Sequence, residues 1–188
     1  MTEHAHSVEY YQSLESGLEY EDFVVDVFYG LGMPLVGLSS RKAQGRGENR
    51  AGFEIKNDKK FRKTGNLYIE TAERHRTDQE FWPSGIFRAD NTWAYAIGDR
   101  QTIYVFAKRH LIAAYERLGE DGSPKYERNG NPTSEGFLYP IRDHKTKRPI
   151  AERTAARVLR LTSRGWVCSV AAERDAALSR AFQREAAE

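Results

Sequence analysis

The sequence contains a single cysteine, Cys168, and no apolar stretch of about 18 residues. One cysteine can form neither an intrachain disulfide nor a cysteine-built zinc site, and without a long apolar run there is no candidate for a membrane-spanning helix. The N-terminal segment MTEHAHSVEY is polar and lacks the apolar core of a signal peptide. These features predict a soluble intracellular protein that has no membrane partner.

Phosphate-binding glycine loops and histidine metal sites are also missing from the sequence. The segment GLGMPLVG follows the end of a predicted helix instead of preceding a helix start, which argues against ATP binding. The five histidines are scattered, and none forms a metal-binding pair. Charged residues, in contrast, make up 30% of the chain, yet the formal net charge is only +2. Local clusters of charge are therefore more informative about partners than the total charge.

Hydrophobic periodicity predicts one α+β domain with a mostly antiparallel central sheet. Residues 7–31 carry an apolar stripe at helical spacing, and Gly32 followed by Pro34 is expected to end this helix. Alternating residues predict strands in PLVGLSS, GFEIKND, NLYIE, TWAYAIG and TIYVFAK. A turn is predicted at KKFRKTG, and a loop or small hairpin over residues 119–136. Further helices are predicted over residues 109–118, over residues 150–161 and from about residue 170 onward.

The strand GFEIKND directs its charged residues to one face. Its apolar residues face one way, whereas Glu54 and Lys56 leave the opposite face. Glu48 precedes Glu54 by six residues at the entry to the strand, and Glu70 has the matching phase on the next predicted strand. If these two strands pair, Glu70 joins the same patch. The competing interpretation of such a strand is an ordinary solvated sheet face.

Converging carboxylates repel each other unless a cation neutralises them, and oxygen ligands without His or Cys favour Mg²⁺, Mn²⁺ or Ca²⁺. Lys56 is not a metal ligand, but its charge can stabilise a phosphate or help to orient and deprotonate a water molecule. A metal ion polarises the phosphoryl oxygen and lowers the pKa of the attacking water. The combination predicts metal-assisted phosphodiester hydrolysis.

The order of Glu48 and Glu54-Ile55-Lys56 resembles the acid-then-ExK pattern of the PD-(D/E)xK nuclease superfamily. The first acid is Glu instead of the usual Asp, no proline precedes it, and the gap to Glu54 is short, as in DNA-nicking endonucleases of the mismatch-repair type. A rival alignment makes Glu54 the first acid and places the second motif at residues 70–72, with Lys56 replacing the missing lysine. Both alignments place Glu54, Lys56 and Glu70 in one site.

The first predicted helix strengthens the resemblance. The segment GLEYEDFVVDVFYGLG is similar to the helix of Holliday-junction resolvases, in which a Glu stands four residues after a Gly and a second Gly closes the helix. The corresponding residues here are Gly17, Glu21 and Gly32. A longer run, from GENRAGFEIKND through TGNLYIE to WPSGI, resembles uncharacterised phage and prophage nucleases. The likeness covers about residues 17–107.

The resemblance implies a restriction-endonuclease-like core over residues 1–120, with a central mixed sheet of four to five strands flanked by helices. Residues 121–188 would form a loop excursion and a helical C-terminal extension packed on this core. Mg²⁺ or Mn²⁺ would be held by Glu48, Glu54, the carbonyl of Ile55 and, in the rival alignment, Glu70. Lys56 would position or activate water, and Glu21 would be an auxiliary carboxylate. The resemblance further implies DNA as substrate, a homodimer, and the cytoplasm of a bacterial or phage-infected cell.

Basic residues flank the acidic strand on both sides, as a phosphodiesterase that holds a polyanion requires. The expected nucleic-acid contacts are Lys42, Gln44 and Arg50 before the strand, and Lys59, Lys60, Arg62 and Lys63 after it. Asp58 is expected to serve a turn or a salt bridge; Ser84 and Asp90 are expected to serve turns, and the alternative for both is contact with the substrate. Two other functions stay open. One is a catalytically inactive nuclease-fold protein that binds DNA or a protein as a phage or accessory factor, and the other is a nuclease for RNA or branched DNA.

Overall fold

The computed structural model of the protein describes residues 8–33, 35, 51–120, 126–127, 133–143 and 145–170. The helical segments are α1 (Val8–Gly30), α3 (Phe61–Thr64), the 3₁₀ turn η1 (Gly85–Phe87), α4 (Lys108–Glu120) and α5 (Ala151–Thr154). The strands are β1 (Phe53–Asn57), β2 (Asn66–Glu73), β3 (Trp82–Pro83), β4 (Ala94–Gly98), β5 (Thr102–Ala107), β6 (Tyr126–Glu127), β7 (Ser134–Pro140), β8 (Arg157–Thr162) and β9 (Gly165–Val170). No helix in these ranges is both long and apolar enough to cross a membrane.

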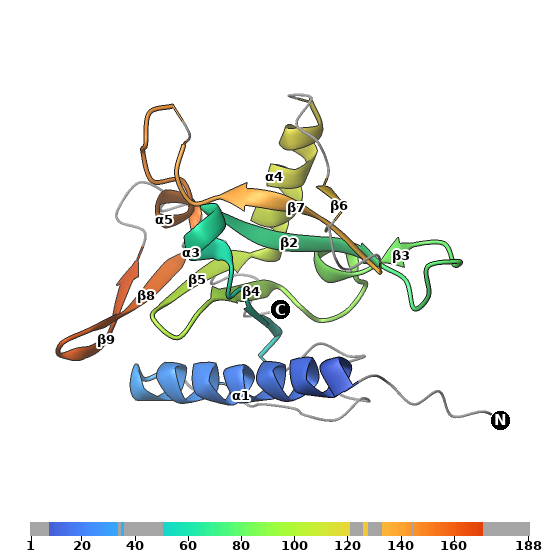
Figure 1. Ribbon diagram of the computed structural model, residues 1–188. Coiled ribbons are helices and arrows are strands. Elements are labelled where there is room, and N and C mark those ends of the chain that lie inside the picture. Colours follow the sequence, from blue (N-terminus) through green and yellow to red (C-terminus); the bar gives the residue numbers. More distant parts are fainter. Residues whose placement is uncertain are drawn as a thin grey trace.

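The strands form two sheets (Figure 1). The larger sheet has the order β1-β4-β5-β8-β9; β1 runs parallel to β4, and every other neighbouring pair is antiparallel. The smaller sheet has the order β3-β2-β7-β6 and is antiparallel throughout. The predicted α+β class, with a mixed and mostly antiparallel five-stranded sheet, is therefore confirmed.

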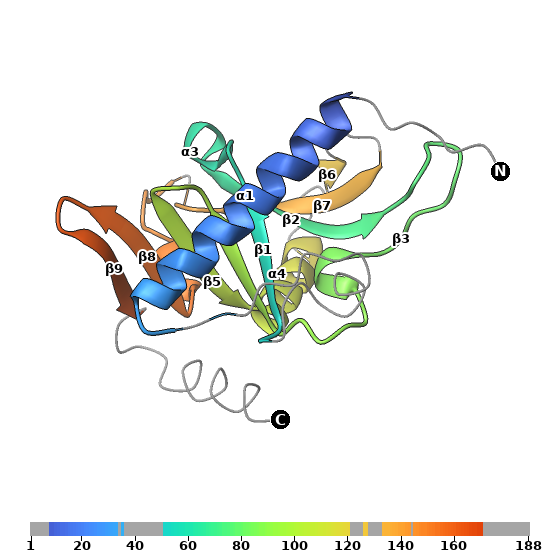
Figure 2. The same cartoon turned by 90° about the horizontal axis from the view of Figure 1, so that it is seen from below.

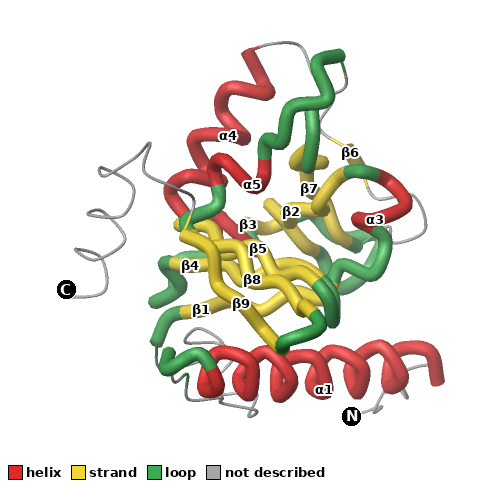
Figure 3. The backbone as a smooth tube through the Cα atoms, turned by 90° about the vertical axis from the view of Figure 1, so that its left-hand side faces the viewer, coloured by secondary structure: helices red, strands yellow, loops and turns green. Residues whose placement is uncertain are grey.

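The elements stack in layers. Helix α1 lies across the strands of the larger sheet on one side, and the smaller sheet and α4 lie on the other side (Figures 2 and 3). Because successive side chains of a strand point to opposite faces, β4 contributes to two cores. Ala94 and Ala96 pack in the core with residues of α1, whereas Tyr95 and Ile97 pack in the core between the sheets. Any polar residue on the inter-sheet face of the larger sheet is therefore either covered by the smaller sheet or exposed at an edge of the larger sheet.

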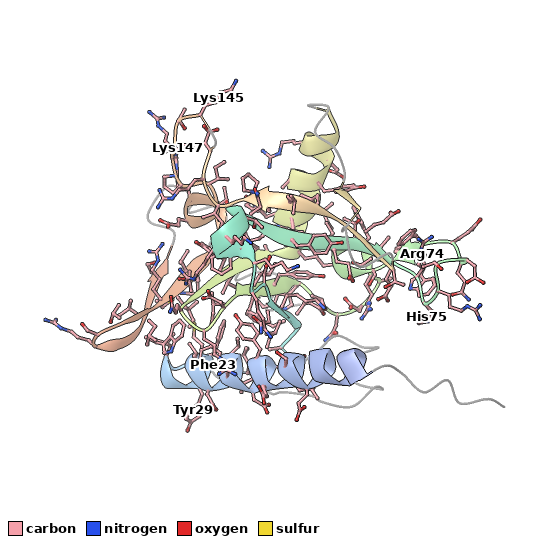
Figure 4. The ribbon with its side chains drawn as sticks, in the orientation of Figure 1. Phe23, Tyr29, Arg74, His75, Lys145 and Lys147 are labelled. Carbon is pink, nitrogen blue, oxygen red and sulfur yellow. The ribbon has the colours of Figure 1, made fainter. Side chains whose placement is uncertain are left out.

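Helix α1 forms and ends as its sequence predicts. Tyr20, Val24 and Phe28 make one buried face at helical spacing. The N–H of Met33 donates to the carbonyl of Phe28 at 2.8 Å, and Gly32 has φ +73°, which closes the helix in the manner of a left-handed C-terminal cap. Figure 4 shows Tyr29 on the side of α1 that points away from the sheets, and its exposure is 74%.

Several sequence predictions are wrong. Residues 150–161 were expected to be helical, but only Ala151–Thr154 is a helix and Arg157–Thr162 is β8. The apolar spacing of Ala155, Val158 and Leu159 imitates a helix, yet β8 pairs with β5 and β9. Residues 61–64 of the predicted turn form the short helix α3.

The region after residue 120 completes both sheets. Strand β6 pairs with β7, which bears out the predicted small hairpin, and β7 also pairs with β2. Strands β8 and β9 extend the larger sheet. The predicted strand PLVGLSS, apart from Leu35, and the predicted helix from about residue 170 onward, apart from its first residue, lie outside the described residues.

Candidate functional site

A cavity of about 580 Å³ lies where α1, β1 and β2 approach one another, beside the start of α3. Strand β1 is the edge of the larger sheet among the described strands, so the space between the two sheets opens here. Isoleucines and small polar residues form part of its lining, and the charged side chains and tyrosines in the lining are Glu21, Lys56, Asp58, Lys59, Lys60, Glu70, Tyr68 and Tyr95. Three of these side chains are carboxylic acids and three are lysines, which makes the lining electrically balanced.

Glu54 and Lys56 form an ion pair against this cavity. The Lys56 Nζ lies 2.5 Å from the Glu54 Oε1, and the side-chain exposures are 41% and 5%, respectively. A carboxylate so deeply buried requires a compensating partner, and Lys56 supplies one while keeping part of its own side chain in solvent. The predicted common face of Glu54 and Lys56 is confirmed. The solvated-sheet-face interpretation is wrong for Glu54, because the smaller sheet lies over that face.

Glu21 approaches the same pair from α1. Burial raises the pKa of the Glu21 carboxyl, the positive charge of Lys56 lowers it, and the negative charge of Glu54 raises it further; the net shift is upward. These interactions place Glu21 within electrostatic reach of both residues. The role of Glu21 as an auxiliary carboxylate stays a prediction, but its position on the cavity wall fits that role.

Glu70 reaches the cavity from the other sheet. The condition under which Glu70 was placed there, pairing of β1 with β2, is not met, because β1 pairs with β4 and β2 pairs with β3 and β7. The Glu70 Oε1 accepts a hydrogen bond from Ser84 at 2.8 Å, and its Oε2 accepts one from Ser134 at 2.9 Å. Gly85 packs so tightly here that a Cβ atom would lie 2.1 Å from the Glu70 carbonyl oxygen. Glu70 is thus a fixed part of the wall that faces β1.

The predicted nucleic-acid contacts after β1 divide into two groups. Lys59 and Lys60 line the cavity, and the Lys59 Nζ donates to the Ser16 hydroxyl at 2.6 Å. Arg62 and Lys63 line a different cavity on the far side of the same turn. Arg62 also donates through its Nε and Nη2 to both carboxylate oxygens of Asp99. The remaining predicted residues, Glu48, Lys42, Gln44 and Arg50, lie outside the described residues.

Asp58 and Asp90 serve turns, as expected, whereas the Ser84 hydroxyl makes no turn hydrogen bond. Asp58 accepts hydrogen bonds from the backbone N–H groups of Lys60 at 3.0 Å and Tyr68 at 2.9 Å, which ties the end of β1 to β2. Asp90 accepts from the N–H of Thr92 at 2.9 Å. Ser84 is fully buried ahead of η1, and its hydroxyl holds Glu70.

Sequence reasoning missed two residues near the centre of the site. Tyr95 stands opposite Glu54 in the β1–β4 register. Burial raises the pKa of the Tyr95 phenol, and the charge of Glu54 raises it further. Burial lowers the pKa of the Arg88 guanidinium, but the nearby carboxylates of Glu54 and Glu73 raise it, and the net shift is upward. The phase of Tyr95 in TWAYAIG could have placed it on the Glu54 side, but no local pattern identifies Arg88.

The donor set decides which metal the site could hold. Glu21, Glu54 and Glu70 offer only oxygen atoms, which suits Mg²⁺ or Mn²⁺ better than zinc. Within the described ranges, however, no cluster of three or more His, Cys, Asp or Glu side chains is arranged to hold a metal ion. A complete cage would need a further ligand, and Glu48 is the residue predicted for that position.

The chain shows no significant match to a known protein family, a curated protein or a solved structure. The functional interpretation therefore rests on the chemistry of the cavity and on the sequence resemblance. A buried carboxylate paired with a lysine lies beside the cavity, and the lining adds three further acids and two further lysines. Such a set can stabilise negative charge, exchange a proton with water and attract a polyanion.

Proposed function

We propose that the protein is a Mg²⁺- or Mn²⁺-dependent nuclease that hydrolyses phosphodiester bonds in DNA, with a restriction-endonuclease-like core of the PD-(D/E)xK type. The observation that supports this most strongly is the buried Glu54–Lys56 pair beside a cavity that Glu21 and Glu70 also line. A buried ion pair is seldom more stable than apolar residues of similar volume. Its presence at the edge of the inter-sheet core, beside this cavity, therefore favours a chemical role.

Under this proposal each residue of the site has a separate role. Glu54, the carbonyl of Ile55 and Glu48 would hold the metal ion, which would polarise the phosphoryl oxygen and acidify a bound water. Lys56 has a partly exposed ammonium group that can stabilise charge on the phosphate or orient the attacking water. Glu21 has a raised carboxyl pKa, which makes its carboxylate a better proton acceptor than an ordinary Glu.

Two substitutions of similar side-chain size test the proposal. Glu54→Gln and Lys56→Met should each abolish Mg²⁺-dependent cleavage of labelled duplex DNA, because each removes one member of the central pair. Glu19→Gln is the matched control, since Glu19 is an exposed carboxylate of α1 with a side-chain exposure of 65%. Circular dichroism and thermal melting must show that all three variants are folded. Undiminished cleavage by folded Glu54→Gln and Lys56→Met proteins would refute the mechanism.

A second candidate is a catalytically inactive protein of the same fold that binds DNA or a protein partner. The observation in its favour is the gap of only six residues between Glu48 and Glu54, which is short for the superfamily. Titration calorimetry with Mn²⁺ separates the two functions, because the nuclease must bind the ion at millimolar concentration or below and the inactive protein need not. A panel of duplex DNA, branched DNA and RNA substrates then identifies the preferred nucleic acid.

A further inference from the structure

A second cavity, of about 540 Å³, lies on the other side of α3, between β5, β8 and the segment that follows β7. Its lining contains five cationic side chains and two carboxylates, an excess of three positive charges. The cations are Arg62, Lys63, Arg142, Lys147 and Arg160, and the carboxylates are Asp143 and Glu152. The first cavity, in contrast, has no such excess. The second cavity is therefore suited to bind an anion without a metal ion.

Both carboxylates of the second cavity are engaged within its wall. The Glu152 Oε1 lies 2.5 Å from the Arg160 Nη2. Asp143 accepts hydrogen bonds from the backbone N–H groups of residues 145 and 146 at 3.0 Å and 2.6 Å. Lys63 and Lys147 form no ion pair with any other described residue, so their positive charges are not neutralised within that part of the chain.

The loop that carries Lys147 is held by its own backbone. The N–H of Lys147 donates to the carbonyl of Asp143, and the N–H of Asp143 donates to the carbonyl of Arg148, each at 2.9 Å. The N–H of Ile150 donates to the carbonyl of Ile141 at 2.8 Å. These bonds fix the backbone on both sides of the cationic residues before a ligand arrives, which lowers the entropy lost on binding.

A single turn connects the two cavities. Residues 58–60 line the first cavity, and residues 61–65 line the second. Phe61 is buried and anchors α3 in the inter-sheet core, so the turn stands as a fixed ridge between the cavities. Lys59 and Lys60 lie on one side of this ridge, and Arg62 and Lys63 on the other. A polyanion that crosses the ridge therefore meets cationic side chains on both sides of it.

We propose that the second cavity binds a backbone phosphate of the DNA substrate at a distance from the bond that is cleaved. This inference rests on the proposed nuclease function for the identity of its ligand. It assigns Lys63, Arg142 and Lys147 to a phosphate site separate from the candidate catalytic cavity. It also predicts a minimum substrate length, because only a duplex that spans α3 can occupy both cavities.

The test uses matched substitutions in the full chain. Lys63→Gln combined with Lys147→Gln removes two charges and keeps side chains of comparable length. Lys145→Gln is the control, because Lys145 is exposed on the same loop but does not line the cavity (Figure 4). Binding is measured by fluorescence anisotropy with chelator present, on duplexes of increasing length up to about 30 base pairs, or about 100 Å.

Each lost phosphate contact should weaken binding of a long duplex roughly fivefold at 0.15 M salt and reduce the slope of log K against log salt by about 0.9. The double variant should therefore bind the longest duplex roughly thirtyfold more weakly, with a slope smaller by about 1.8. The loss should shrink below a threshold length, and Lys145→Gln should bind like the wild-type protein at every length.

The outcomes separate this proposal from the nuclease proposal. Unchanged binding by the double variant, with wild-type cleavage intact, refutes the second phosphate site and leaves the nuclease function standing. Length-dependent weakening in a protein that never cleaves supports the phosphate site and refutes the catalysis. Inorganic phosphate and a mononucleotide serve as further probes. If either one shifts the NMR signals of Lys63 and Lys147 while the double variant binds DNA normally, the site takes free phosphate and the proposal is overturned.

Discussion

Replacing Lys56 with methionine should destabilise the protein more than replacing its partner Glu54 with glutamine. Lys56→Met leaves a carboxylate whose side chain is only 5% exposed without its ion-pair partner. Glu54→Gln leaves an ammonium group on a side chain that is 41% exposed, and that group can turn toward water. The two substitutions remove the same ion pair, so any difference between them reports which partner depends on it.

The expected size follows from the burial of each partner. Breaking a fully buried pair costs about 3–5 kcal/mol, and exposed pairs contribute about 0.2–1 kcal/mol. One partner here is buried and the other is partly solvated, and Arg88 supplies a second positive charge near Glu54. Lys56→Met should therefore lower the free energy of unfolding by about 2 kcal/mol, or the melting temperature by about 4–8 °C. Glu54→Gln should cost less than about 1 kcal/mol.

Urea denaturation at neutral pH, followed by circular dichroism, measures these differences, and the variant carrying both substitutions completes the cycle. The double variant should be more stable than Lys56→Met alone, because the neutral amide no longer needs a cation. The coupling free energy should be at least about 1 kcal/mol. Equal stability of Lys56→Met and wild-type protein would refute the reasoning, since the buried carboxylate would then not depend on Lys56.

Three further substitutions probe the surroundings of the site. Burial raises the pKa of Glu21 above its ordinary 4.5, so the folded protein is most stable, as far as Glu21 is concerned, when this carboxyl is protonated. This contribution to the free energy of unfolding is complete below pH 4.5 and is lost as the pH rises through the folded-state pKa. Glu21→Gln should therefore be slightly more stable than wild type at pH 7 and equal to it below pH 4, as urea titrations at both pH values will show. Lys108→Met should lower the free energy of unfolding by about 3 kcal/mol in the same assay, because it leaves the Asp90 carboxylate, whose side chain is only 2% exposed, without its ion-pair partner. Gly85→Ala should cost several kcal/mol and reduce cleavage, because φ is +51° and the added Cβ would meet the Glu70 carbonyl oxygen; a wild-type melting curve would contradict this.

The elements that the sequence predicts well are those whose signal is local. The stripe of Tyr20, Val24 and Phe28 needs no knowledge of the partner layer to predict a helix, and the segments TWAYAIG and TIYVFAK are correctly predicted as the strands β4 and β5. Strand pairing is different, because it depends on residues far apart in the chain. Neighbouring strands in the sequence often pair, but here the segment after β1 leaves the larger sheet and returns as β4 parallel to β1.

The same limit applies to the site. Alternation alone places Glu54 and Lys56 on one face, but it cannot show what covers that face. The smaller sheet covers that face. Glu70 belongs to this sheet and lies opposite β1 across the cavity, an arrangement that strand pairing between β1 and β2 would not have produced. The helix prediction for residues 150–161 failed for a related reason, because Ala155, Val158 and Leu159 have helical spacing and only their neighbours β5 and β9 show that residues 157–162 form a strand.

The position of the Glu54–Lys56 pair on an edge strand accounts for the charges in GFEIKND. The next residues on the inter-sheet face, Tyr95 and Ile97 of β4, are buried and pack in an apolar core, so an apolar residue at position 54 would have extended that core. A carboxylate at position 54 loses the stabilisation that a buried apolar side chain would provide there, and it also needs Lys56 to remain close. Because the edge opens into the cavity, Lys56 can meet both Glu54 and solvent, which would be impossible one strand further in. The charged strand is therefore best explained as part of a site open to a ligand.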